Sequence, residues 1–174
     1  MPGGVHHVYA RGNRQQAIYL DDCDRLNYLR LLGHVVCDYR WRCLAFCLMH
    51  NHVHMVVETP QPNLGIGMQR LHGLYGRLFN HRHGRTGHLF QGRYGAIAIR
   101  TDEQLWAVVR YVAMNPVKAG LCSDPQEWRW GSCGRPPSWL DQARLLQYLG
   151  AAGGNPWRRY AELTATTFNP QAGV

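Results

Sequence analysis

Hydrophobic residues recur along the 174-residue chain with spacings that alternate between those of strands and those of helices. Residues 5–9 are short and β-prone, and the turn-forming residues 11–13 follow them. Over residues 21–39 the apolar side chains recur every three or four positions, behind an Asp-Asp pair that suits a helix N-terminus. The N-terminal part of the chain therefore predicts a strand, a basic loop and a helix.

A hairpin and a second helix are predicted next. Residues 41–49 form a continuous apolar run, and residues 52–57 are β-rich until Pro60 ends the strand. Between them, His50 and Asn51 supply a turn. Residues 64–79 then carry apolar side chains at helical spacing and lead into a basic, histidine-rich turn.

The following elements are a strand and a third helix. Residues 89–100 favour a strand. The helix is expected from Asp102, whose side chain can cap free backbone N–H groups, to Asn115, which precedes Pro116. The order βαββαβα, with an antiparallel sheet and helices packed on one face, corresponds to a ferredoxin-like α+β fold. Beyond these elements the chain is rich in Pro, Trp and Gly, and only residues 138–149 look helical.

Chain length and charge bound the function further. The length allows one domain with a C-terminal appendage. Lys and Arg number 19 against 11 Asp and Glu, so the formal net charge of +8 favours a polyanionic partner but is also compatible with a solvated basic surface. No apolar run approaches the roughly 20 residues that span a bilayer, and nothing resembles a signal peptide. We therefore expect a cytoplasmic protein without a membrane partner, whose 6 cysteines are reduced.

A pair of histidines on a predicted strand is the first candidate for chemistry. His52 and His54 are two residues apart, so both side chains project from the same face of the strand and can chelate one cation. The pairs His50/His52 and His81/His83 have the same spacing. Only the pair at 52 and 54 lies wholly on a predicted central strand, which favours it as a ligand pair.

The third helix carries a second candidate. Its apolar stripe leaves Tyr111 on the flank, and Asn115 follows one turn later on the same side. A phenol can act as a nucleophile, and an amide oxygen can serve as a third metal ligand. The residues alone also suit a half-buried core tyrosine and a helix C-cap, and by themselves they favour these ordinary roles.

A zinc-binding structural protein is a different possibility. Cys43 and Cys47, followed by His50, have a spacing that could hold zinc. Both cysteines also lie in an apolar, strand-like run, where small buried thiols are the ordinary interpretation.

Five sequence blocks resemble one known family. The run Met-His-Asn-His-Val-His at residues 49–54 is similar to the Met-Pro-Asn-His-Val-His signature of the HUH single-tyrosine transposases, which move bacterial insertion sequences as single strands. Residues 111–120 resemble the tyrosine helix of the REP-associated branch of that family. Residues 5–14, 87–94 and 128–132 resemble further family blocks in the same order.

The extent of this resemblance suggests a domain organisation. It covers residues from about 5 to 132. We therefore expect an HUH transposase/nuclease domain over residues 1–132 and a C-terminal extension over residues 133–174, partly helical and, by analogy, regulatory. His50 stands where the family usually has proline, which could alter the hairpin turn or add a competing ligand.

The resemblance also implies a mechanism. His52, His54 and Asn115 would hold Mg²⁺ or Mn²⁺, and Tyr111 would attack the scissile phosphate to give a 5′-phosphotyrosine and a free 3′-OH. By ligand type alone, zinc would suit these residues as well. The family likeness places such an enzyme on DNA in a bacterial cytoplasm, where it would cut and rejoin single-stranded DNA without ATP.

Single-stranded or hairpin DNA is the expected partner, and basic and amide residues in loops and at helix ends are its expected contacts. These residues are Arg11, Asn13, Arg14, Arg77, Arg82, Arg85, Arg93, Arg100 and Lys118. Tyr75, Phe90 and Tyr94 are candidate base-stacking platforms, although core packing suits Phe90 better. A nucleic-acid-binding module without catalysis is the alternative function, and both a monomer and a homodimer remain open.

Overall fold

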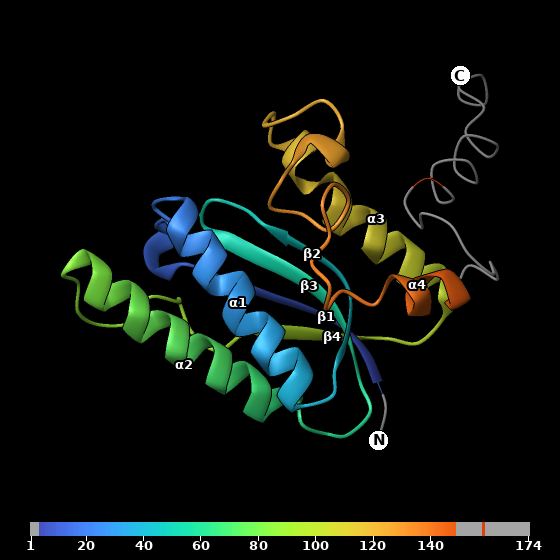
Figure 1. Ribbon diagram of the computed structural model, residues 1–174, viewed down its shortest axis with the longest axis horizontal. Coiled ribbons are helices and arrows are strands. Elements are labelled where there is room, and N and C mark those ends of the chain that lie inside the picture. Colours follow the sequence, from blue (N-terminus) through green and yellow to red (C-terminus); the bar gives the residue numbers. More distant parts are fainter. Residues whose placement is uncertain (1–3, 149–157, 159–174) are drawn as a thin grey trace. The chain divides into compact units, whose positions relative to one another are not determined.

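The computed structural model describes residues 4–148 and 158, and the chain divides into two compact units, Met1–Leu140 and Asp141–Val174. The first unit contains a 4-stranded antiparallel sheet in the order β2-β3-β1-β4 (Figure 1). Its strands are β1 (Gly4–Arg11), β2 (Arg42–Leu48), β3 (His52–Thr59) and β4 (Gly95–Ile99). Its helices are α1 (Asp22–Asp38), α2 (Leu64–His83) and α3 (Asp102–Lys118), with single 3-10 turns at η1 (Asn13–Gln15) and η2 (Pro125–Glu127). The predicted ferredoxin-like α+β order is confirmed.

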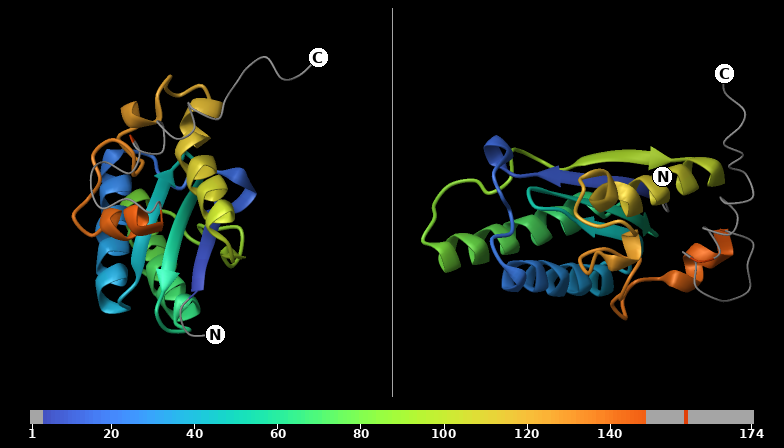
Figure 2. Two further views of the ribbon diagram at one scale, coloured as in Figure 1. Left: turned by 90° about the vertical axis from the view of Figure 1, so that its right-hand side faces the viewer. Right: turned by 90° about the horizontal axis from the view of Figure 1, so that it is seen from above.

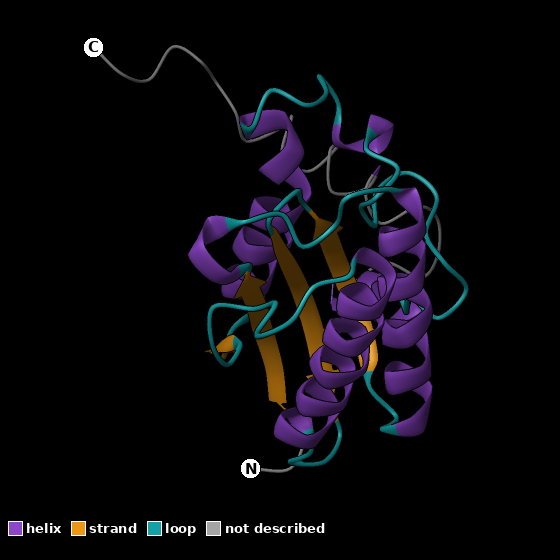
Figure 3. Ribbon diagram, turned by 90° about the vertical axis from the view of Figure 1, so that its left-hand side faces the viewer, coloured by secondary structure: helices purple, strands orange, loops and turns teal. Residues whose placement is uncertain are grey.

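The two faces of the sheet are covered by different helices. Alternate side chains of the central strands, among them Val8 and Met55, enter a core that also contains Leu32 of α1 and Leu71 of α2. Figure 3 shows α1 and α2 side by side on this face. The opposite face, which carries His54, contacts α3 (Figure 2, left). The expected packing of helices on one face therefore holds for α1 and α2, while α3 lies on the other.

The fourth strand is shorter than the sequence predicts. Residues 89–94 form an irregular segment that runs beside the loop after β1, where Gln91 N donates to Arg11 O at 2.9 Å and Asn13 N donates to Leu89 O at 2.8 Å. Phe90 turns toward α2 and stacks on His72 with ring centroids 4.0 Å apart. Because its apolar side chain is buried there and not in a sheet ladder, regular pairing begins only at Gly95.

The third helix begins and ends differently from the prediction. Thr101, not Asp102, is the N-cap, since its hydroxyl accepts a hydrogen bond from Gln104 N. The helix also continues through Pro116 to Lys118. A proline this close to a C-terminus removes a single backbone donor, and the last turn persists. That extra turn carries Lys118 to the ring of Tyr111.

The free edge of β2 is covered by the segment that follows α3. Leu48 N donates to Trp130 O at 2.9 Å, and Ser132 N donates to Phe46 O at 3.0 Å. Phe46 N in turn donates to the buried Ser132 hydroxyl at 3.1 Å. This segment satisfies backbone groups that an exposed edge strand would leave unpaired.

In the second unit, α4 (Gln142–Tyr148) matches part of the helix expected over residues 138–149. Residues 149–157 and 159–174, most of the expected extension, lie outside the described residues. None of the helices in the described residues combines the length and the apolar character of a membrane-spanning segment.

Candidate active site

Two adjacent strands place a row of polar side chains on the α3 face of the sheet. The antiparallel register of β1 and β3 sets Tyr9 opposite His54 and Arg11 opposite His52. The His52 and His54 rings share this face, with their centroids 5.1 Å apart. The predicted two-residue spacing therefore brings both imidazoles to one place.

The third helix adds the predicted tyrosine and amide. The Tyr111 ring stands nearly perpendicular to that of His54, with centroids 5.3 Å apart. Its side chain is 41% exposed, unlike that of a core tyrosine. One turn later, Asn115 Nδ2 donates to Tyr111 O at 2.7 Å, and the Asn115 side chain is near enough to His52 to raise the pKa of that imidazole. Tyr111, His52, His54 and Asn115 thus form one cluster, which we call the HUH cluster.

The HUH cluster opens into a cavity of about 550 Å³. Strands β1 and β3, helix α3 and the segment before β4 all contribute to its wall. The chemically active side chains that line it are Tyr9, Arg11, His52, His54, Arg93 and Tyr111. A substrate in this cavity would therefore meet imidazole, phenol and guanidinium groups together.

A third histidine, His7, contacts the HUH cluster and was not singled out from the sequence. It is 8% exposed, and its Nε2 lies 3.0 Å from Nδ1 of His54. The two imidazoles stack at 5.2 Å, and Tyr111 meets the edge of His7 at 5.8 Å. Because His7 lies diagonally across the strand pair from His54, the contact depends on the register of β1 and β3.

All three imidazoles are held in the neutral form. Burial, together with the neighbouring imidazoles of His7 and His52, lowers the pKa of His54 to about 3. Burial also lowers the pKa values of His7 and His52, although the Asn115 hydrogen bond partly opposes this effect at His52. A neutral imidazole keeps the lone pair that a metal ligand needs.

The neighbours of the two strand histidines suit a ligand pair. Asn51 Oδ1 lies 2.8 Å from His52 Nδ1, so this nitrogen donates and Nε2 keeps its lone pair. When His54 Nδ1–H donates to His7, the Nε2 lone pair of His54 is free in the same way. The oxygen of Asn115 adds a further donor atom. The residues present therefore fit a divalent cation by the chemistry of their donor set.

The expected DNA-contact residues fall into three groups. Arg11 and Arg93 line the cavity, and Lys118 Nζ lies 5.3 Å from the centroid of the Tyr111 ring. Asn13 and Arg77, again with Arg93, line a second groove of about 1030 Å³. The others lie outside both cavities: Arg14, Arg82, Arg85 and Arg100.

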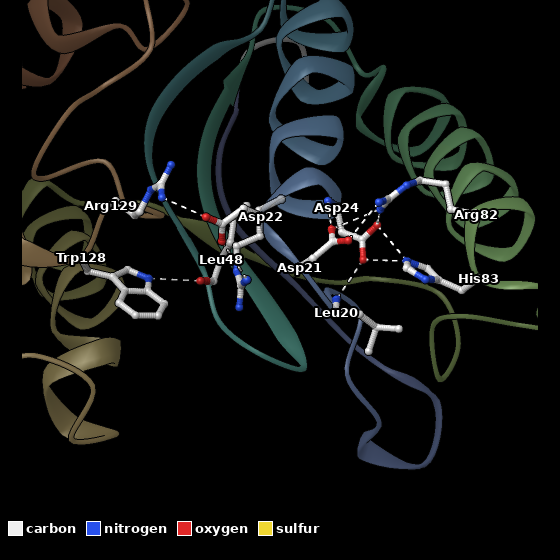
Figure 4. Close-up of polar contacts among 10 residues, drawn as sticks. Leu20, Asp21, Asp22, Asp24, Leu48, Arg82, His83, Trp128 and Arg129 are labelled. Atoms are coloured by element: carbon white, nitrogen blue, oxygen red, sulfur yellow. Dashed lines mark hydrogen bonds and ion pairs between the residues drawn. The ribbon is translucent and has the colours of Figure 1, made fainter.

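Arg82 is engaged within the fold (Figure 4). Its guanidinium hydrogen bonds to Asp21 and Asp24 at the start of α1, and Asp24 also contacts His83. Asp21, Asp24 and His83 are close enough to share a cation, yet the Arg82 guanidinium already neutralises the carboxylates. The group joins α1 to the end of α2, and we leave Arg82 out of the proposed DNA contacts.

Several sequence alternatives find no support in the described residues. Cys43 and Cys47 are both buried on opposite faces of the sheet, and burial raises the pKa of each thiol to about 12, which suits protonated core residues and not a zinc pair. His50 is exposed in the hairpin turn and does not line the cavity. The idea that Tyr75 stacks on bases is wrong, because Tyr75 is buried and donates to Ile18 O at 2.5 Å.

Comparison with known proteins adds a family context. The family described as "Transposase IS200 like" matches residues 4–115. A Haemophilus influenzae protein named "Putative REP-associated tyrosine transposase" is 25% identical over 145 residues, covering 76% of this chain and 79% of the relative. A solved structure described as that of a REP-associated tyrosine transposase bound to a REP hairpin aligns with a TM-score of 0.63 at 19% identity, covering 76% of this chain and 78% of that one. At this identity the structural likeness concerns the fold alone.

Proposed function

The chain belongs to the IS200-like transposase family, a family of DNA-cleaving enzymes, and we propose that it cuts and rejoins single-stranded DNA through a metal-dependent attack by Tyr111. The observation that carries this proposal is the HUH cluster itself. An exposed phenol from α3 and two neutral imidazoles from β3 meet in one cavity, and the Asn115 amide lies one helical turn from the phenol. The basic residues around the cavity suit a phosphate-bearing substrate.

We further propose that the substrate is hairpin or palindromic repeat DNA. A solved structure that shares this fold is bound to a REP hairpin, and a relative of the chain carries the REP-associated name. The net charge of +8 supports binding to such a polyanion.

His52, His54 and Asn115 would hold the cation. Held by these residues, a divalent ion would supply positive charge against the charge that grows on the phosphate in the transition state. His7 fixes the orientation of the His54 ring through its hydrogen bond, and Asn51 does the same for His52. Arg11 and Arg93, on the cavity wall, position the phosphate backbone.

Tyr111 supplies the nucleophile. Its phenolic oxygen forms a bond to phosphorus as the bond between phosphorus and the 3′ oxygen breaks. The phenol gives up its proton, and the departing 3′ oxygen takes one up. Lys118 holds a positive charge beside the ring that carries the attacking oxygen. Because a phenolate is a competent leaving group, a 3′-OH can attack the phosphotyrosine in reverse and rejoin the strand.

The proposed function is tested by trapping the covalent intermediate. Fluorescently labelled hairpin DNA is incubated with the protein and Mg²⁺ or Mn²⁺, and the products are separated on a denaturing gel. A metal-dependent protein–DNA adduct is expected, and EDTA should abolish it. A protein that binds the hairpin tightly but forms no adduct with either metal would instead be the non-catalytic binding module.

Asn115→Ala sharpens the test of the ligand set. This variant keeps the nucleophile but removes one donor atom, so its adduct yield should fall at low metal concentration and recover partly in excess metal. An adduct yield that does not depend on the metal concentration in this variant would remove Asn115 from the proposed ligands.

A further inference from the structure

A second cavity adjoins the one that holds the HUH cluster. It is a groove of about 1030 Å³ between one side of α2 and the segment before β4. Gln91, Gly92 and Arg93 line both spaces, so the groove and the catalytic cavity share a wall. A chain molecule lying in the groove could therefore continue into the catalytic cavity.

The lining of the groove is basic. Arg77 projects from α2 and Arg93 from the shared wall, and His88 stands nearby. No Asp or Glu is present among the described residues that line the groove. This charge distribution is complementary to a phosphate backbone.

Rings and apolar groups lie between these charges. Tyr94 is partly buried and lines the groove, while Leu89 and the exposed Ile66 provide apolar surface. Cationic groups interleaved with an aromatic face bind phosphates and unpaired bases together. A duplex presents mainly phosphates on its outer surface, so this lining suits separated bases better.

The width of the groove depends on three glycines of α2. A Cβ atom added at Gly65, Gly73 or Gly76 would lie 3.8–3.9 Å from its nearest neighbour, so alanine would fit at each of these positions without a clash. By contrast, a Cβ at Gly67 would clash with the Trp41 ring. Each glycine inside a helix costs about 1 kcal/mol relative to alanine. Packing within the described chain explains Gly67 but not the other three, which leave the groove open.

We propose that this groove holds the single-stranded DNA that adjoins the scissile phosphate and guides it into the catalytic cavity. The proposal rests on the proposed function, because it names where the same substrate runs. The shared wall, the basic lining and the ring of Tyr94 support it. The glycines of α2 that line the groove are positions where a larger side chain can be introduced to test it.

The test measures how much single-stranded tails add to hairpin binding, without metal, so that no cleavage is needed. Affinity is measured by fluorescence anisotropy for a DNA hairpin with oligothymidine tails and for the same hairpin without tails. The wild-type protein should bind the tailed hairpin more tightly. Gly73→Met, which fills the groove, and Arg77→Ala should each reduce this advantage by ~10-fold or abolish it.

Two controls separate the groove from folding and from general charge. Gly73→Ala should melt at a higher temperature than the wild type, which shows that the fold tolerates a side chain at this position. Arg70→Ala removes a charge from the same helix outside the groove, where Arg70 pairs with Asp38 at 3.2 Å, and should keep the tail advantage.

The outcomes distinguish the two proposals. If the tails add nothing in the wild type, or add as much in Gly73→Met and Arg77→Ala as in the wild type, the groove proposal is wrong even though metal-dependent adducts form. If the wild type forms no adduct but shows the groove-dependent tail advantage, the proposed chemistry fails while the groove proposal stands.

Discussion

His52 and His54 lie on one strand face but have different neighbours, which makes them separable by mutation. His52 is partly exposed beside Asn51 and Asn115, whereas His54 is buried against His7 and Tyr111. Each offers one nitrogen to the proposed cation, and neither belongs to the main core on the other face of the sheet.

We predict that His52→Ala and His54→Ala each abolish DNA cleavage while the protein remains folded. His50→Ala serves as the control, because His50 is exposed in the adjoining turn. This variant should cleave DNA nearly as well as the wild type. Cleavage of labelled hairpin DNA in Mg²⁺ and thermal melting are measured for all three. Near-normal cleavage by both strand variants would contradict the proposed metal site.

His7 should act through His54 and not on the substrate. We predict that His7→Leu, which cannot accept the hydrogen bond from His54 Nδ1, weakens metal binding by about 10- to 100-fold. His7→Gln retains an acceptor oxygen and should recover part of the affinity. Calorimetric titration of the DNA-free protein with Mn²⁺ measures both. Equal affinities in wild type and His7→Leu would show that His7 only fills space.

At the residue level, periodicity predicted which residues share a face but not which meet across strands. The spacing of His52 and His54, and of Tyr111 and Asn115, is local, so strand and helix geometry alone put each pair together. The contact of His7 with His54 depends on strand register. The ion pairs of Arg82 with the start of α1 join residues about 60 positions apart, which no local pattern indicates.

Helix α2 carries a partly buried histidine, His72, that makes the stability of the fold depend on pH. His72 stacks on Phe90, lies 3.4 Å from the Tyr28 hydroxyl, and has its pKa lowered by burial to about 4. The unfolded chain therefore binds a proton at His72 more tightly than the folded one. The resulting stability is fully present above pH 6.5, the ordinary value, and is lost as the pH falls toward about 4.

We predict that His72→Gln reduces this loss. Between pH 7 and pH 4, protonation of His72 should lower the free energy of unfolding of the wild type by up to about 3 kcal/mol. Solvent that reaches the groove beside His72 makes the loss smaller than this upper value. His7, His52 and His54 contribute in the same direction, so the informative quantity is the difference between wild type and His72→Gln. Urea unfolding at several pH values measures it. If the stability of the wild type and that of His72→Gln fall by the same amount between pH 7 and pH 4, His72 is not responsible for the loss.

At the element level, strong periodicity predicted well and irregular segments did not. The long helices and the hairpin strands lie within a few residues of the expected positions. Residues 89–94 have the apolar content of a strand, but tertiary packing of Phe90 on α2 outweighs that tendency. Pro116 indicated a helix end at Asn115, but the helix ends three residues later, at Lys118, because a final turn tolerates one missing donor.

For the whole molecule, the positions of the sequence blocks along the chain do not indicate which blocks lie together in the fold. Residues from β1, the start of β3, the segment before β4 and α3 surround a single cavity. The block at residues 128–132 serves elsewhere, since it covers the edge of β2. Hydrophobic periodicity and residue spacing favoured ordinary structural roles for Tyr111 and Asn115. Only the family resemblance joined these two residues to the strand histidines in one predicted site.

In the proposed mechanism Tyr111 forms the covalent bond to DNA, and a second tyrosine in the same cavity provides a matched control. Tyr9 is 40% exposed and Tyr111 41%, and both rings lie near His54. Replacing either by phenylalanine removes one oxygen, keeps the ring and should change stability by no more than about 1 kcal/mol.

The decisive measurement is the adduct yield of Tyr111→Phe beside that of Tyr9→Phe, with hairpin DNA affinity and thermal stability recorded for both. We predict that both variants fold and bind hairpin DNA, that Tyr9→Phe still forms the metal-dependent adduct, and that Tyr111→Phe forms none, because phenylalanine has no oxygen with which to attack phosphorus. A Tyr111→Phe protein that still becomes covalently joined to DNA would contradict the mechanism.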